Sequence, residues 1–419
     1  MNPSEPGRAA PVPTPEEIRR FYERMPYPAP FTTLEEHREL YRNPDRRRAQ
    51  FRLLWPAEPL RETQEILVAG CGTSQAARYA LREPGSRVTA IDISATSLRY
   101  TRDLQQKYGL QNLELQQLAV ENVRALGRTF DQIVCTGVLH HLPDPDLGLA
   151  ALREVLAPQG AMQLMVYAPY GRAGIYMMQE YCRLLGVSAT PEELRDLDSV
   201  LDALPGDHPL AALMHGAKDF RHPDALADAL LHPLDRAYSV PQLYAWLERC
   251  GLVFARWVQQ APYLPQCGAI AKTRHAARLA ALREPAQHAA LELLRGTMVR
   301  HSLIAYRSDR SGERQPISFD ERCAAYVPIP LPWTVCVRER LPPGCAAVLI
   351  NRAHPFTDLI LTVDPFEDRL HAGIDGQRTV AQILERAGAD TEEAKGRALG
   401  FFRRLWQYDQ VVFDASGGG

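Results

Sequence analysis

Several features are missing from this sequence, beginning with any ordered arrangement of its cysteines. The eight cysteines include no CxxC pair and follow no regular spacing. A disulfide framework or a zinc site would need paired or regularly spaced cysteines. We therefore expect reduced thiols in a cytoplasmic protein that holds no metal.

Long apolar runs and an excess charge of one sign are also missing. No stretch approaches the roughly 20 apolar residues that span a bilayer, and the proline-rich residues 1–13 lack the apolar core of a signal peptide. The 48 basic and 50 acidic side chains nearly cancel, which leaves no overall field to attract nucleic acid or an anionic membrane. We expect neither as a partner.

The sequence does have the length and composition of a globular protein with more than one domain. Its 419 residues exceed an ordinary single core, and its hydrophobic fraction is 46%. A basic run, Arg46 to Arg48 with Arg42 and Arg52 nearby, is expected to form a solvated helix face. The expected parts are an N-terminal arm with lid helices (1–60), a main domain (61–310) with a helical cap inserted at 170–235, a linker (311–341) and a small C-terminal domain (342–419).

Strands and helices alternate from Glu65 onwards. The expected strands are "EILVAG", "RVTAID", "LELQQLA", "FDQIVCTG" and "AMQLMVYA". Short apolar runs of this kind are typical of buried parallel strands. The pattern predicts an α/β fold with a Rossmann-like, doubly wound sheet. Within it, Ser94 and Ser239 are each expected to cap the start of a helix.

A glycine-rich segment after the first strand, "VAGCGTS", is expected to approach a ligand. Gly70 and Gly72 lack a Cβ, so the backbone can turn sharply and come close to a bound group. Asp92 ends the next strand, where a carboxylate can bind both ribose hydroxyls of an adenosine cofactor. A dinucleotide would need a third glycine so that its pyrophosphate rests on the helix N-terminus. Residues 73–75 contain none, which disfavours that alternative.

The segments "ILVAGCGTSQAA", "VTAIDIS", "FDQIVCTGVLHHLPDP" and "LREVLAPQGAMQLMVY" resemble successive motifs of class I S-adenosylmethionine-dependent methyltransferases, especially those that act on small metabolites. The resemblance covers about Glu65 to Tyr167 and implies S-adenosyl-L-methionine as the cofactor. By the same resemblance, Gly70, Cys71, Gly72 and Thr73 would line its methionine moiety, Asp92 its ribose, Ile93, Leu118 and Ala119 its adenine, and Cys135 and Thr136 its amino end.

The sequence departs from the pattern of that family at three positions. Val68 stands where the family usually has an acidic residue, which would orient the cofactor's ammonium group. Ser74 replaces a third glycine, and Leu118 replaces an acidic residue near the adenine. Each departure would weaken or re-route cofactor binding, whereas the order of the motifs is unaffected.

The pair His140-His141 follows the fourth strand, at the edge where open α/β sheets bind ligands. A histidine there could take a proton from the acceptor as the methyl group is transferred. In the family that this sequence resembles, the pair is often structural, with one ring tying the loop to the sheet. Both roles stay open.

Aromatic residues flank the expected cofactor site on two sides. Tyr22 and Tyr27 belong to an N-terminal segment that commonly closes over the cofactor in the family, although an ordinary hydrophobic anchor is the alternative. Tyr167, Tyr170 and Arg172 leave the fifth strand above the methyl group. Two tyrosines and an arginine would suit an anionic or aromatic acceptor. We expect the N-terminal helix and the inserted cap to form a lid that excludes water.

The C-terminal region loosely resembles small PqqD-like winged-helix modules that capture peptides. The resemblance rests mainly on "IDGQRTVAQIL", whose apolar spacing is also that of any packed helix. A docking or dimerisation domain is the alternative, and a homodimer could form through this domain or through the cap.

Four functions are weighed against one another. The first is methyl transfer to an O, N or S atom of a small molecule, and the second is methylation of a peptide or protein held by the C-terminal domain. A regulatory or scaffold protein that binds S-adenosylmethionine without catalysis is supported only by the missing acid at Val68. A nucleotide-dependent oxidoreductase is disfavoured by the absent third glycine.

Overall fold

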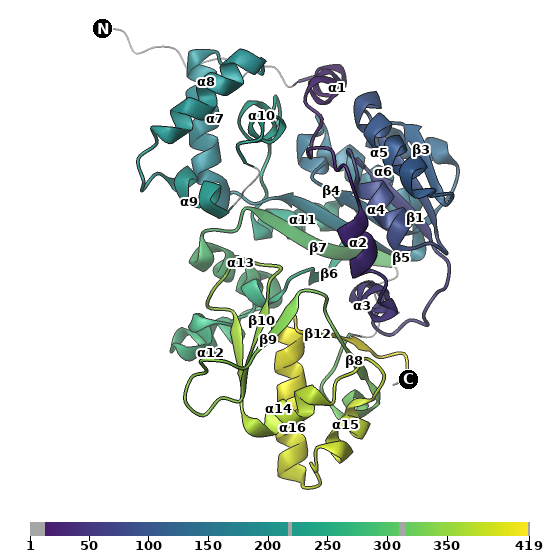
Figure 1. Cartoon of the computed structure of the whole chain (residues 1–419), viewed down its shortest axis with the longest axis vertical. Helices are drawn as coiled ribbons and strands as arrows, with labels where there is room; N and C mark the ends of the chain where they lie inside the picture. Colours follow the sequence, from purple (N-terminus) through teal and green to yellow (C-terminus); the bar gives the residue numbers. More distant parts are fainter. Residues whose placement is uncertain (1–12, 217–219, 310–315, 418–419) are drawn as a thin grey trace.

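The computed structural model of the protein is described here for residues 13–216, 220–309 and 316–417. Figure 1 shows the main domain beside a helical cap, with a C-terminal lobe at the opposite end of the molecule. Within the described residues, no helix combines the length and the apolar character that crossing a membrane requires.

A seven-stranded sheet forms the centre of the main domain, in the order β3-β2-β1-β4-β5-β7-β6. Strands β1 to β5 pair in parallel, whereas β7 runs antiparallel to both of its neighbours, β5 and β6. The predicted Rossmann-like sheet is confirmed, with β7 as the exception to its parallel order. The strands are β1 (Glu65–Ala69), β2 (Arg87–Asp92), β3 (Leu113–Gln117), β4 (Phe130–Thr136), β5 (Leu156–Tyr167), β6 (Leu252–Trp257) and β7 (Arg300–Arg307).

Helices cover both faces of this sheet. Their starts follow local capping chemistry: the Ser94 hydroxyl accepts a hydrogen bond from the backbone N–H of Ser97, and Ser239 forms a capping box with Gln242. Both predicted caps are thereby confirmed. The helices are α4 (Gln75–Arg82), α5 (Ala95–Tyr108), α6 (Pro145–Val155), α11 (Val240–Arg249), α12 (His275–Ala280) and α13 (Glu284–Arg295).

The N-terminal segment and the cap pack on each other. Helix α1 (Pro15–Arg24) begins after Thr14, which caps it, and is followed by α2 (Glu35–Leu40) and α3 (Pro44–Leu54). Phe21 of α1 is buried in the same apolar cluster as the cap residues Ile175 and Leu226. The cap therefore shares a core with α1. Its helices are α7 (Ala173–Leu185), α8 (Pro191–Asp202), α9 (Pro209–Gly216) and α10 (Pro223–Leu231).

The C-terminal lobe begins within the segment that we expected to be a linker. Residues 327–337 form two strands that pair with later parts of the lobe: β8 with β12, and β9 with β10. The expected linker is therefore structured over these residues. The elements are β8 (Val327–Pro330), β9 (Thr334–Val337), β10 (Ala347–Asn351), β11 (Ile360–Val363), α14 (Pro365–Ala372), α15 (Val380–Arg386), α16 (Glu392–Gln407) and β12 (Val411–Asp414).

The basic run on α3 holds this lobe against the main domain. Arg48 and Arg52 each place a guanidinium nitrogen 2.9 Å from a carboxylate oxygen of Asp414, at the end of β12. Arg52 is buried. The prediction of a wholly solvated basic face is therefore wrong for these two residues, because the carboxylate that pairs with them lies more than 360 residues later in the chain.

Candidate functional site

A cavity of about 750 Å³ opens at the carboxyl ends of the parallel strands and runs under α1 and the cap. This is the edge at which open α/β sheets bind ligands, and the volume is typical of ligand pockets. Of the predicted site residues, the cavity is lined by Gly70, Cys71, Gly72, Asp92, Ile93, Leu118, Thr136, Tyr22, Tyr27, Tyr167 and Arg172.

The two glycines of the loop after β1 are required by conformation and by space. Both adopt left-handed φ angles, +68° at Gly70 and +56° at Gly72. A Cβ on Gly70 would lie 2.2 Å from a methyl group of Val138, and one on Gly72 would lie 3.2 Å from the carbonyl oxygen of Tyr27. The sharp turn expected of the two glycines is present, and the loop passes close under the N-terminal segment.

Asp92 lies beneath this loop with its carboxylate buried. One oxygen accepts a hydrogen bond from the backbone N–H of Gly72 at 2.8 Å, and the other accepts one from Ser94 at 2.9 Å. Burial raises the pKa of Asp92, against the opposing effect of these backbone donors. Each oxygen keeps a lone pair for a further donor. The two hydroxyls of a ribose would supply those donors, so the residues present fit an adenosine cofactor.

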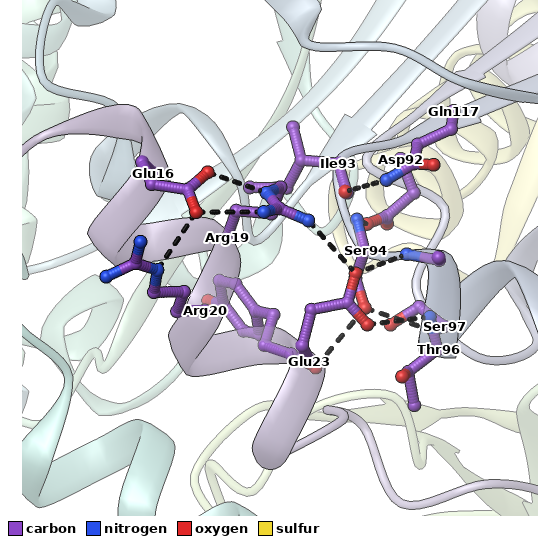
Figure 2. A network of polar contacts seen from close by, with 12 residues as sticks. Glu16, Arg19, Arg20, Glu23, Asp92, Ile93, Ser94, Thr96, Ser97 and Gln117 are labelled. Atoms are coloured by element: carbon purple, nitrogen blue, oxygen red, sulfur yellow. Dashed lines mark hydrogen bonds and ion pairs between the residues drawn. The ribbon is translucent and has the colours of Figure 1, made fainter.

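Helix α1 is fastened beside Asp92 by polar contacts. The Glu23 carboxylate accepts hydrogen bonds from the first backbone N–H groups of α5, those of Ala95 at 2.8 Å and Thr96 at 3.0 Å (Figure 2). The Ser94 hydroxyl donates to the carbonyl oxygen of Tyr22 at 3.3 Å. A carboxylate at a helix N-terminus is favourable. These contacts hold Tyr22 over the cavity.

A buried carboxylate that sequence reasoning missed, Asp228, lies at the cap side of the cavity. It is 3% exposed, and its two oxygens accept hydrogen bonds from the hydroxyls of Tyr22 and Tyr167, both at 3.2 Å. Helices α1 and α10 and strand β5 thus meet at one carboxylate. A signal was present in "PDALADALL": Asp224 lies in the first turn, where acids are common, but Asp228 lies in the middle of a helix that is otherwise apolar on every face, which points to a buried charge.

The positive charge of Arg172 is already neutralised within the protein. Its guanidinium forms an ion pair with the buried Asp235, and its carbon lies 3.5 Å from the centre of the Tyr167 ring. It also donates to the Tyr176 hydroxyl at 3.2 Å. Arg172 lines the cavity as predicted, but this pairing leaves it poorly suited to hold an anionic acceptor.

The two histidines after β4 are buried and tied to the end of the cap. The His141 Nδ1 lies 2.7 Å from the carbonyl oxygen of Leu234, to which it donates. His140 is fully buried, and its ring packs against that of Tyr167 with 3.9 Å between the ring centres. Burial lowers the pKa of His140 well below the usual range. Neither histidine is among the described residues that line the cavity. The geometry agrees with the structural role that the sequence left open.

The other predicted site residues also lie outside the cavity lining. Thr73 is buried, and its hydroxyl donates to the carbonyl oxygen of Pro28 at 2.8 Å, which holds the N-terminal segment onto the loop. Cys135 is buried in the core. Ala119 is half-buried and follows the lining residue Leu118, and Tyr170 is 43% exposed. These four have places next to the cavity rather than in it.

Comparison with known proteins places the main domain in a family. Residues 67–162 match the family described as "Methyltransferase domain". An uncharacterized protein of Synechococcus sp. is 38% identical over 203 residues, 45% of this chain and 47% of that protein. A ubiquinone biosynthesis O-methyltransferase of Pasteurella multocida is 28% identical over 24% of this chain and 44% of that enzyme. The chain thus spans about half the length of these curated relatives.

One solved structure resembles nearly the whole chain. The match to PKMT2 from Rickettsia typhi covers 92% of this chain and 76% of the PKMT2 chain. Its TM-score is 0.63 at 17% sequence identity. At this identity the likeness concerns the fold, and its extent includes both the main domain and the C-terminal lobe. With the family match and the Asp92 site, this fold implies S-adenosyl-L-methionine as the cofactor. Residues 67–162 therefore belong to a methyltransferase domain of the class I, S-adenosylmethionine-dependent kind.

Proposed function

We propose that this protein transfers a methyl group from S-adenosyl-L-methionine to an O, N or S atom of a small-molecule acceptor. The observation that carries the proposal is the continuity of one cavity, which extends from the glycine loop and Asp92 to Tyr167 and Asp228 under the cap. When bound, the cofactor supplies a methyl group on a positively charged sulfur. Asp92 would hold its ribose, and the loop at Gly70 and Gly72 would pass along its methionine end.

Helix α1 and the cap cover the acceptor part of the cavity. Tyr22 from α1 and the cap residues Ile175 and Phe220 line it from above, and Tyr167 lines it from the sheet. Closure around the reacting atoms favours transfer because the protein then positions the acceptor and no water competes for the methyl group.

The position of the C-terminal lobe supports a small acceptor over a peptide held by that lobe. Among the described residues, none after Arg300 lines the cavity. The lobe instead packs on α3, at the ends of the sheet strands opposite the glycine loop. A peptide bound by the lobe would have to reach around the main domain before it met the methyl group.

Two measurements test the proposal. Calorimetric titration with S-adenosylmethionine, S-adenosylhomocysteine, NAD and NADP should show binding of the first two alone. Transfer from methyl-labelled S-adenosylmethionine should then appear in a low-molecular-weight metabolite extract and not in its protein fraction. Binding of a dinucleotide without binding of S-adenosylmethionine would refute the assignment, and label confined to protein would refute the small acceptor.

A further inference from the structure

The acceptor end of the cavity carries a negative charge that the protein does not neutralise. Asp228 is buried and accepts hydrogen bonds only from neutral hydroxyl groups, those of Tyr22 and Tyr167. Over the described residues, no lysine or arginine forms an ion pair with it. Arg172, which also lines this part of the cavity, is paired with Asp235 instead. His141, which acts electrostatically on Asp228, gives its Nδ1 hydrogen to the carbonyl oxygen of Leu234.

A buried carboxylate without a cation is costly. Taking an ionised carboxylate out of water is repaid only by a paired charge and by hydrogen bonds to its remaining lone pairs. An ionised carboxylate accepts about four hydrogen bonds, and two are made here. Burial raises the pKa of Asp228, which is the signature of a charge whose compensation is incomplete.

The surroundings of Asp228 fix the direction from which a further donor can come. The hydroxyl of Tyr22, on α1, donates to one carboxylate oxygen of Asp228, and the hydroxyl of Tyr167, on β5, donates to the other. The two tyrosines that donate to Asp228 also line the cavity beside it. A carboxylate flanked by aromatic faces favours a cationic group over a neutral or anionic one.

We infer that Asp228 binds the acceptor through an ammonium group, so that the substrates of this enzyme are amines. The inference rests on the proposed methyltransferase function and names its substrate class. It replaces the anionic acceptor that Arg172 suggested from the sequence. The amine could be that of a small metabolite or of a lysine side chain, since both present the same group.

The chemistry balances with Asp228 as the proton acceptor. A bound R–NH3⁺ gives one proton to the carboxylate, which leaves a neutral nitrogen with a free electron pair. That nitrogen forms the new C–N bond while the C–S bond breaks and its electron pair stays on sulfur. The product leaves as R–NH2⁺–CH3, and the carboxyl group returns its proton to water. A carboxyl group of raised pKa suits this exchange.

The test compares the binding affinities of matched ligands, measured in the presence of saturating S-adenosylhomocysteine and in its absence. The probes are n-hexylamine, hexan-1-ol and hexanoate, with Nα-acetyl-lysine N-methylamide against its norleucine counterpart for the side-chain source. The parent protein should bind hexylamine at least tenfold more tightly than hexanol and should discriminate against hexanoate. Equal binding of amine and alcohol, or tightest binding of hexanoate, overturns the inference without any variant. The lysine and norleucine arms show which amine source fits.

Asp228→Asn keeps the shape of the side chain and removes its charge. The variant should lose at least tenfold in hexylamine affinity and keep its affinity for hexanol, and persistence of the amine preference would overturn the inference. Asp224→Asn is the matched control, since Asp224 lies one turn earlier on α10 beside His222 and outside the cavity lining. Its ligand affinities should stay within twofold of the parent. Failure to bind S-adenosylhomocysteine would instead sink the proposed function itself.

Discussion

Replacement of Asp92 by alanine should damage both cofactor binding and the folded protein. The two backbone donors at Gly72 and Ser94, 2.8 Å and 2.9 Å from the carboxylate, would lose their acceptor in a buried place. An unsatisfied buried donor costs about 1–3 kcal/mol, so the two together should lower the free energy of unfolding by about 2–6 kcal/mol. The loss of the ribose contacts should weaken cofactor binding by a further ~1.5–3 kcal/mol.

That loss of affinity corresponds to a dissociation constant raised roughly 10- to 150-fold, at about 1.4 kcal/mol for each factor of ten. Titration with S-adenosylhomocysteine measures the affinity, and urea denaturation measures the unfolding free energy. Asp103→Ala, an exposed change on the adjoining helix α5, is the control and should alter neither. The reasoning is refuted if Asp92→Ala keeps affinity within twofold, or if its stability equals that of the control. Asp92 is therefore a buried structural acceptor as well as the expected ribose ligand.

Four further substitutions test the cofactor loop, the two histidines after β4 and one buried histidine elsewhere in the main domain. Gly72→Val should abolish S-adenosylhomocysteine binding in calorimetry, because a left-handed φ and the Tyr27 carbonyl at 3.2 Å leave no room for the side chain. His140→Asn and His141→Asn should each lower the melting temperature, and any loss of turnover should track that loss, whereas a fall in turnover at unchanged stability would indicate a proton-transfer role. Burial lowers the pKa of His288 from 6.5 to about 4, so protonation favours the unfolded chain and stability is lost as the pH falls below 6.5. His288 should contribute about 2 kcal/mol to the fall in unfolding free energy between pH 7.5 and pH 5, and His288→Gln should make that fall smaller by this amount in denaturant titrations at the two pH values.

The features predicted well are those that depend on neighbouring residues. Ser94 and Ser239 cap helices because a hydroxyl reaches backbone N–H groups a few residues on. The glycine loop and Asp92 come together because consecutive parallel strands place their carboxyl ends side by side. These relations involve residues that are close in sequence or on consecutive strands. The residues of the cofactor half of the cavity could therefore be predicted from the sequence.

The features predicted poorly depend on partners far away in the chain. Strands β8 and β9 lie in a stretch rich in arginine and proline that carries little strand signal, and they exist because β12 and β10 pair with them. The same holds for Arg52, whose buried charge is matched by Asp414. The local preference of a segment for strand or helix does not reveal a pairing partner that comes close only in the folded protein.

The acceptor half of the cavity is built from such distant contacts. Arg172 is next to Tyr167 in sequence and invites the interpretation of an anion site, but the cap delivers two acids to the same place. Asp235 forms the ion pair with Arg172, and Asp228 accepts hydrogen bonds from the two tyrosine hydroxyls. The carboxylate of Asp228 is therefore the one that we propose binds a ligand. Had either acid been apolar, Arg172 and the remaining acid would balance each other, and these three positions would carry no net charge to select a cation. The sign of the substrate's charge is therefore decided by the inserted cap, while the sheet beneath it decides the cofactor.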